Sequence, residues 1–176
     1  MLLHVCCANC AAHPLEILKR DFDITMFFYN PNIYPRKEYL KRLASVRKLS
    51  LISGVPLMTG RYQNRAWARA VRGYEDEPEG GKRCRLCFAM RLEKTAYLAR
   101  KYNMDFFAAT LSVSPHKDSY TISQTARNIS RTLGIDFFDS DFKKKDGFKK
   151  TMELSRSYGL YRQDYCGCIY SIRKRD

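Results

Sequence analysis

The sequence lacks the segments that direct a chain into or across a membrane. No stretch approaches the ~18–20 apolar residues that span a bilayer, and the N-terminus has neither the basic nor the apolar segment of a signal peptide. We therefore expect a cytoplasmic protein without a membrane partner. Internal repeats, low-complexity tracts and linkers are also lacking, which predicts a single domain over residues 1–176.

Acidic residues are scarce in comparison with basic ones. The chain has 18 Asp and Glu against 32 Lys and Arg, which amounts to a formal net charge of +14. A domain of this charge usually binds a polyanion, and nucleic acid is expected before an anionic membrane surface. The alternative is a high isoelectric point that serves no binding role.

Short apolar segments alternate with stretches of helical periodicity along the chain. Five strands are expected within residues 2–6, 22–35, 55–60, 105–118 and 135–142. Helices are expected over residues 13–21, 36–53, 86–102, 119–133 and 147–160, with a short basic helix from residue 64 and an irregular tail over residues 160–176. This alternation predicts an α/β fold, a Rossmann-like domain whose parallel sheet carries helices on both faces. Ligands of such folds bind at the carboxyl ends of the strands, where the first cysteines are expected.

Seven cysteines are the most unusual feature of the sequence, and they fall into three groups. The groups are Cys6, Cys7 and Cys10; Cys84 and Cys87; and Cys166 and Cys168. In a reducing compartment such groups favour metal binding or redox catalysis over structural disulfides. "CRLC" begins a predicted helix, whose dipole is expected to lower the thiol pKa. Four thiolates suit an iron–sulfur cluster or zinc, and three cysteines remain beyond a set of four.

The tail segment "YCGCIY" is the most diagnostic of these groups. A disulfide between residues two apart closes a tight, strained ring, and strained disulfides tend to be oxidising and catalytic. Gly167 supplies the backbone freedom that such a ring requires. We therefore interpret Cys166 and Cys168 as a redox-active pair. A second metal-binding pair and two idle thiols are the alternatives.

The loop "SPHKD" after the fourth predicted strand offers other chemical groups. His116 and Asp118 are candidates for a proton donor or an additional metal ligand, and Asp164 is a weaker candidate for the same role. His4 and His13 are expected to be structural, because one lies in a buried strand and the other near a helix start.

Three basic stretches are candidate RNA contacts. They comprise Arg61, Arg65, Arg69 and Arg72; Lys82, Arg83 and Arg85; and Lys143, Lys144 and Lys145. The first interleaves arginines with Tyr62 and Trp67, a pattern that suits an unpaired RNA loop whose phosphates bind the arginines and whose bases stack on the rings. The alternative is a solvated helix face with Trp67 in the core. The second stretch would bring RNA to the cysteines themselves.

Four motifs together resemble the QueH-type epoxyqueuosine reductases. They are "HVCCANC", "CRLCFAMRLEKTA", "FAATLSVSPHKD" and "DYCGCIYS", and they extend over nearly the whole chain. That family resembles the adenine-nucleotide α-hydrolase branch of Rossmann-like folds. "CCANC" stands where those enzymes have a Gly/Ser-rich pyrophosphate loop, so ATP use is not expected here.

The resemblance implies the last step of queuosine biosynthesis, in which an epoxide on the modified wobble base of tRNA is reduced to an alkene. It implies a [4Fe-4S] cluster on Cys6, Cys7, Cys84 and Cys87, and a redox-active pair in Cys166 and Cys168. Cobalamin is not expected. An additional iron is associated with the family, for which Asp118 or Asp164 are candidate ligands. The electron donor is not identified by the sequence, and Cys10 has no derived role.

Two other functions are compatible with the residues. The first is an iron–sulfur tRNA-thiolating enzyme of the same broad fold, which would require ATP. The second is a zinc-bearing RNA-binding module without catalysis, which would have no use for "CGC".

Overall fold

Five short parallel strands form the centre of the structure, in the order β3-β2-β1-β4-β5. The computed structural model describes residues 1–172. The strands are β1 (Leu2–His4), β2 (Thr25–Phe28), β3 (Leu57–Thr59), β4 (Phe106–Ala109) and β5 (Asp136–Phe137). Leu3 pairs with Met26 of β2 on one side and with Ala108 of β4 on the other. Strand order reverses between β1 and β4, which makes the carboxyl ends of these two strands the expected binding crevice.

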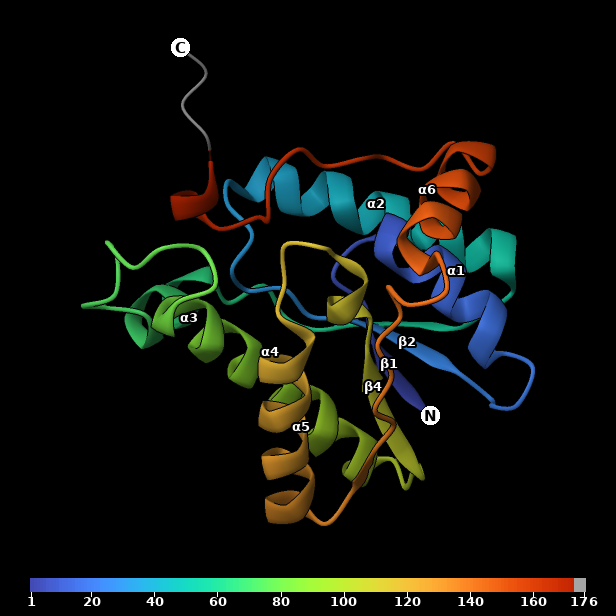
Figure 1. Cartoon of the computed structure of the whole chain (residues 1–176), viewed down its shortest axis with the longest axis horizontal. Helices are drawn as coiled ribbons and strands as arrows, with labels where there is room; N and C mark the ends of the chain where they lie inside the picture. Colours follow the sequence, from blue (N-terminus) through green and yellow to red (C-terminus); the bar gives the residue numbers. More distant parts are fainter. Residues whose placement is uncertain (173–176) are drawn as a thin grey trace.

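Helices cover both faces of the sheet, as predicted. They are α1 (Ala8–Leu18), α2 (Arg36–Ser53), α3 (Asn64–Ala70), α4 (Lys82–Lys101), α5 (Ser119–Leu133) and α6 (Gly147–Ser157). Figure 1 shows α1, α2 and α6 on one side of the strands and α4 and α5 on the other. α1 packs against α2 and α6, and α4 packs against α5 and β1. None of the described helices is long and apolar enough to cross a membrane.

The central strands are mostly apolar because both of their faces are covered. Leu2, Leu3, Phe27 and Phe107 are fully buried. His4 is buried among them and donates from Nε2 to the Tyr29 carbonyl oxygen at 3.0 Å. Burial, followed by the charge of Arg91, lowers the pKa of His4 to about 4, so this histidine is neutral and structural, as expected.

Two helices begin earlier than their periodicity predicts, and both shifts move cysteines onto helices. α1 begins at Ala8 and not at residue 13, and α4 begins at Lys82 and not at residue 86. Cys10 is therefore helical, and "CRLC" occupies the first turns of α4. The fifth strand is two residues long, and a 3-10 helix, η1 (Thr110–Val113), follows β4.

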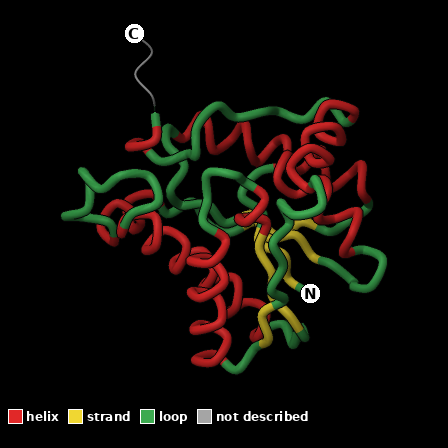
Figure 2. The backbone as a smooth tube through the Cα atoms, in the orientation of Figure 1, coloured by secondary structure: helices red, strands yellow, loops and turns green. Residues whose placement is uncertain are grey.

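The tail is irregular, as predicted, apart from the 3-10 helix η2 (Ile169–Ser171). After α6 the chain runs back along α2, as the loop at the top of Figures 1 and 2 shows. Lys48 Nζ donates to the Gly159 carbonyl at 2.9 Å, and the Tyr161 N–H donates to Ser45 Oγ at 3.1 Å. This path carries residues 166–168 over the carboxyl end of the sheet; residues 173–176 of the predicted tail lie outside the described residues.

Candidate metal and redox site

The first cysteines lie just beyond the carboxyl end of β1, at the point where strand order reverses. Cys7 caps the N-terminus of α1, because its Sγ accepts the Cys10 N–H at 3.4 Å. The Sγ atoms of Cys6, Cys7 and Cys10 all lie within 4.8 Å of one another, and all three residues are buried. Gln163 Nε2 donates to Cys7 Sγ at 2.9 Å. Cys10 therefore completes a triad of sulfur atoms that could hold a metal ion.

The three thiols of this triad have very different proton affinities. Contacts with Cys10 and Cys7 lower the pKa of Cys6 well below its usual range. Contacts with Cys6 and Cys7, together with burial, raise the pKa of Cys10. Contact with Cys10 lowers the pKa of Cys7, but contact with Cys6 and burial outweigh it and raise this pKa to about 12. Cys6 is thus the thiol of the three that loses its proton most readily, and a metal bound by all three would displace the protons that the thiols carry.

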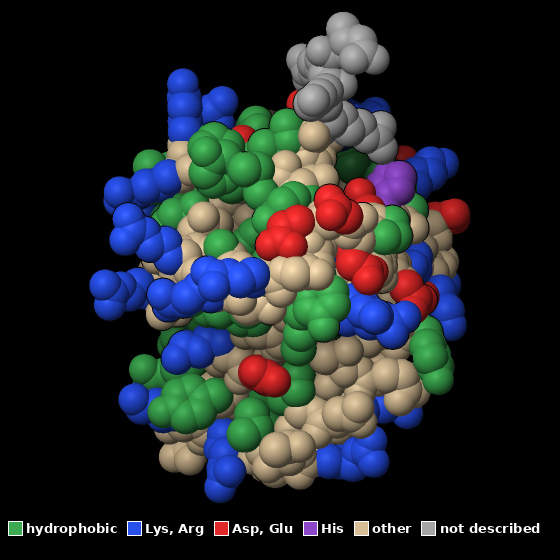
Figure 3. All heavy atoms as spheres, turned by 90° about the vertical axis from the view of Figure 1, so that its left-hand side faces the viewer, with side chains coloured by type: hydrophobic (Ala, Val, Ile, Leu, Met, Phe, Trp, Pro, Cys, Tyr) green, Lys and Arg blue, Asp and Glu red, His purple; other side chains and the backbone are tan. Residues whose placement is uncertain are grey.

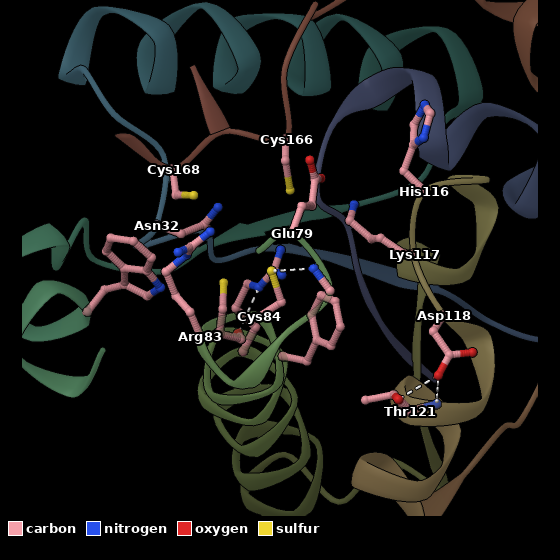
Figure 4. A pocket seen from close by; sticks show the side chains of 15 residues that line it. Asn32, Glu79, Arg83, Cys84, His116, Lys117, Asp118, Thr121, Cys166 and Cys168 are labelled. Carbon is pink, nitrogen blue, oxygen red and sulfur yellow. Dashed lines mark hydrogen bonds between the residues drawn. The ribbon is translucent and has the colours of Figure 1, made fainter. Parts of the chain in front are cut away.

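The other four cysteines line a narrow chamber between the N-terminus of α4 and the tail (Figure 4). Cys84 and Cys87 belong to the first two turns of α4, and Cys166 and Cys168 face the chamber from the tail. Burial raises the pKa of both Cys84 and Cys87. The predicted lowering by the helix dipole is therefore wrong, because removal of the thiolate from water outweighs the effect of the helix N-terminus.

Two cations that sequence reasoning missed lie between the triad and the chamber. Burial lowers the pKa of Arg91 and of Lys117, but the surrounding thiols, Cys6 and Cys166 among them, outweigh burial and raise both values. Figure 4 shows the Lys117 side chain reaching from its loop toward Cys166. Arg91 lies seven residues after Cys84 and therefore on the same face of α4, a spacing that could have identified it.

Four buried polar atoms on the chamber wall have no hydrogen-bond partner within residues 1–172. They are Asn32 Oδ1, Trp67 Nε1, Arg83 Nε and Arg91 Nη2. Buried polar groups are nearly always satisfied, so unpaired atoms around one chamber indicate a bound group. Three of the four are N–H donors beside thiols, which is the usual surrounding of a sulfur-ligated metal. These residues therefore fit an anionic metal–sulfur group.

The predicted proton donors and additional ligands lie at the edge of the chamber. Asp118 caps α5 and accepts from the Thr121 N–H and from Thr121 Oγ1, at 2.9 and 2.5 Å. These hydrogen bonds lower the pKa of Asp118, which makes its carboxylate a poor acid at neutral pH. Figure 4 shows Asp118 turned toward Thr121 and His116 pointing away from the labelled thiols. Asp164 lies beyond the chamber, on the wall of a second cavity.

This second cavity, the outer cavity, has a volume of about 490 Å³. It is bounded by α1, α6, the tail and residues 113–117, and the thiols of Cys6, Cys10 and Cys166 contribute to its lining. Cys166 and Lys117 line both the outer cavity and the chamber. The outer cavity therefore opens onto the same thiol that lines the chamber with Cys84 and Cys87.

A buried ion pair of α2 holds the tail segment that contains Cys166 and Cys168 in place. Arg42 Nε donates to Glu38 Oε1 at 2.7 Å, and the two side chains are 2% and 9% exposed. Arg42 Nη1 and Nη2 donate to the carbonyl oxygens of Cys166 and Tyr165, at 2.9 and 3.0 Å. Gly167 has φ +133°, and a Cβ there would lie 3.0 Å from Arg42 Nη1. The backbone conformation and the close approach of the guanidinium both require glycine here, whereas the strained disulfide ring that led to the expectation of glycine stays a prediction.

The structure removes one of the predicted RNA contacts. Arg83 is buried, and its Nη1 donates to three backbone carbonyls in residues 74–77, so it stabilises that loop and is unavailable to RNA. Lys143 Nζ donates to the Lys117 carbonyl at 2.9 Å. Trp67 is buried, which confirms the alternative that places it in the core. The remaining predicted residues are exposed, namely Arg61, Arg65, Arg69, Arg72, Lys82, Arg85, Lys144 and Lys145.

The face that carries α3 is mixed in charge. Figure 3 shows acidic side chains gathered in its middle, with Lys and Arg around them. Glu75, Asp76 and Glu79 of the loop before α4 are exposed acidic residues. An RNA at this face would meet its basic margins and not a continuous basic surface.

Comparison with known proteins places the chain in a family. Residues 1–174 match the family model described as "Epoxyqueuosine reductase QueH". The protein of that name from Streptococcus pyogenes serotype M1 is 41% identical over 98% of this chain and 70% of its own length. The one from Thermotoga maritima is 38% identical over 99% of this chain and 91% of its own length.

A solved structure shares the fold at much lower sequence similarity. The U34-tRNA thiolase NcsA from Methanococcus maripaludis, solved with its [4Fe-4S] cluster, aligns with a TM-score of 0.55 at 10% identity. The alignment covers 98% of this chain and 62% of NcsA. This likeness confirms the predicted adenine-nucleotide α-hydrolase-like fold. From the family model and these relatives, we conclude that the chain belongs to the QueH family of epoxyqueuosine reductases.

Proposed function

We propose that this chain reduces epoxyqueuosine to queuosine at the wobble position of tRNA, the last step of queuosine biosynthesis. One observation carries the proposal besides family membership: Cys166 and Cys168 share a chamber with Cys84 and Cys87, and Cys166 also faces the outer cavity with Cys6. Cys166 therefore lies where the proposed redox pair, the cysteines proposed to bind metal and a cavity large enough for a substrate adjoin one another.

The reaction balances with a dithiol as the two-electron donor. Oxidation of Cys166 and Cys168 to a disulfide releases two electrons and two protons. Both are consumed when the two C–O bonds of the epoxide break, a C=C bond forms and the oxygen leaves as water. An external reductant then regenerates the dithiol. A dithiol stores both electrons, whereas an iron–sulfur cluster transfers one at a time.

The residues that would hold a [4Fe-4S] cluster are Cys6, Cys7, Cys84 and Cys87, with Cys10 beside the first two. When bound, such a cluster supplies one-electron transfer and, at an open iron, Lewis-acid activation of an oxygen. Arg91 would face this group with its unpaired Nη2. An additional iron is part of the proposal, with Asp118 or Asp164 as its candidate ligands; Asp118 also accepts hydrogen bonds as the N-cap of α5. ATP and cobalamin are not required.

Lys117 is the charged group best placed to assist the departing oxygen. Its ammonium lies on the wall common to the chamber and the outer cavity. A cation there stabilises negative charge that develops on the oxygen. The lowered pKa of Asp118 opposes the proton donation predicted for that residue.

The test is turnover of tRNA that carries epoxyqueuosine by anaerobically purified protein. Visible absorbance is expected, with about four sulfides and about five irons per chain, four of the irons in the cluster and one outside it. Cys166→Ser and Cys168→Ser should each abolish product while the visible spectrum is retained. Added ATP should have no effect. A colourless protein with one zinc, or full turnover by both variants, would contradict the proposal.

A further inference from the structure

The outer cavity adjoins the chamber and shares Cys166 and Lys117 with it. We infer that it binds the modified base of the substrate nucleotide, with its epoxide-bearing ring directed at Cys166. This inference rests on the proposed function. The volume of about 490 Å³ is within the range of sites that enclose a small organic ligand.

The cavity combines reactive groups at one end with apolar surface along one side. Cys6, Cys10 and Cys166 contribute thiols to its lining, and α6 contributes Phe148 and Met152. Phe148 is 39% exposed, although it is a large apolar side chain. An aromatic ring left exposed beside a cavity is a surface on which an unpaired base can stack.

A buried hydroxyl supplies an independent indication of a ligand. Thr151 lies one turn after Phe148 on α6, lines the cavity and is 1% exposed. Its Oγ1 has no hydrogen-bond partner within residues 1–172. A buried hydroxyl without a partner is destabilising, so a polar atom of a bound base would satisfy it.

Another cavity, of about 420 Å³, is lined by residues of α5 and of the segment after β5. It has neither thiols nor an unpartnered buried hydroxyl among its described lining residues. Its polar groups already bind one another: Ser123 and Arg127 donate to Asp139, and Ser119 donates to Asp141. Among the described residues that line it there is no cysteine. Tyr120 of this cavity is 70% exposed and thus provides a matched aromatic control.

The experiment compares two anticodon stem-loop RNAs, one with epoxyqueuosine and one with guanine at the wobble position. Binding of both RNAs to the purified holoenzyme is measured by fluorescence anisotropy, and turnover of the first gives KM and kcat. The variants are Phe148→Ala, Phe148→Tyr, Thr151→Val and, as the control, Tyr120→Ala. Loss of one stacking contact corresponds to a decrease in affinity of about tenfold.

We expect wild type to bind the epoxyqueuosine RNA more tightly than the guanine RNA. Phe148→Ala and Thr151→Val should each weaken binding of the modified RNA and raise its KM about tenfold, and Phe148→Tyr should restore both values. Tyr120→Ala should behave as wild type. Equal binding of the two RNAs by wild type would overturn the inference, and so would unchanged preference in both Phe148→Ala and Thr151→Val. Selective binding that depends on Phe148, without any product, would support the cavity and refute the proposed reaction.

Discussion

Replacing Arg42 by Met should release the tail that carries the redox pair. The guanidinium donates to the carbonyl oxygens of Cys166 and Tyr165, at 2.9 and 3.0 Å. Hydrogen bonds from a charged donor are worth about 1.5–3 kcal/mol each, so the two hold the tail by about 3–6 kcal/mol. Because 1.4 kcal/mol corresponds to a factor of ten, the detached state should become at least about 100 times more populated.

The assay is the rate at which Cys168 reacts with iodoacetamide under anaerobic reducing conditions, measured by mass spectrometry of its peptide. Cys168 is buried, so it reacts only when the tail detaches, and its rate should rise about 100-fold in Arg42→Met. Lys48→Met is the matched control, because Lys48 also lies on α2 and donates to a tail carbonyl, that of Gly159. This second contact is exposed, and its loss should change the rate less than about threefold.

If Cys168 reacts at an unchanged rate in folded Arg42→Met protein, Arg42 does not hold the tail. Other contacts would then hold it, such as the hydrogen bond from the Tyr34 N–H to the Gly167 carbonyl. Removal of Arg42 also leaves Glu38 buried with the Tyr161 hydroxyl and without its cation, a change that costs about 3–5 kcal/mol of stability. Glu38→Gln combined with Arg42→Met removes this stranded charge. The double variant should regain stability and keep the high rate.

Gly167→Ala should lower the unfolding temperature and the activity, because residue 167 has φ +133° and its new Cβ would lie 3.0 Å from the Arg42 guanidinium. Gly54→Ala is the control: this residue has φ +71°, and no atom lies within 4 Å of the new Cβ. It should lower the free energy of unfolding by only about 1 kcal/mol. Co²⁺ binding to protein freed of iron can be followed by its visible absorbance. Arg91→Met should weaken this binding about 10-fold or more. Arg85→Met, which replaces an exposed arginine of the same helix, should leave the affinity for Co²⁺ unchanged. His4 has a pKa of about 4 when folded and the usual 6.5 when unfolded, so the unfolded chain binds the proton first and stability falls as the pH drops from 6.5 to 4. Urea unfolding should show this loss, about 3 kcal/mol, in wild type and not in His4→Gln. Equal slopes in the two proteins would contradict the burial of a neutral His4.

The periodicity of apolar residues along the chain is sufficient to predict the architecture. Alternating apolar segments and helical stretches predicted the parallel sheet with helices on both faces, because a βαβ chain has few other ways to bury them. The helix over Ser119–Leu133 has the predicted bounds, since Gly134 takes up the left-handed conformation after its last residue. Asp118 directly precedes this helix, and aspartate is a typical N-cap. Its position before a predicted helix therefore argues against a role as proton donor.

Helix starts were harder to predict where cysteine takes part. Serine, threonine, aspartate and asparagine are the usual N-caps, so a thiol cap at Cys7 has no common sequence signature. The periodicity therefore predicts a start of α1 that is five residues too late. Cys10 lies on the first turn of this helix, and only the resulting turn brings its sulfur within 4.8 Å of the other two. Its part in the triad could not be seen in the spacing alone.

The sequence by itself determined the fold class and the grouping of the cysteines, because each depends on residues close together in the chain. Only the tertiary structure decided which groups meet. Arg42 contacts Cys166 across 124 positions, and Lys117 and Arg91 reach the same thiols from separate elements. Arg83 is buried although Lys82 and Arg85 of the same basic stretch are exposed. Such contacts leave no local periodicity, since they arise from the packing of elements that are distant in the sequence.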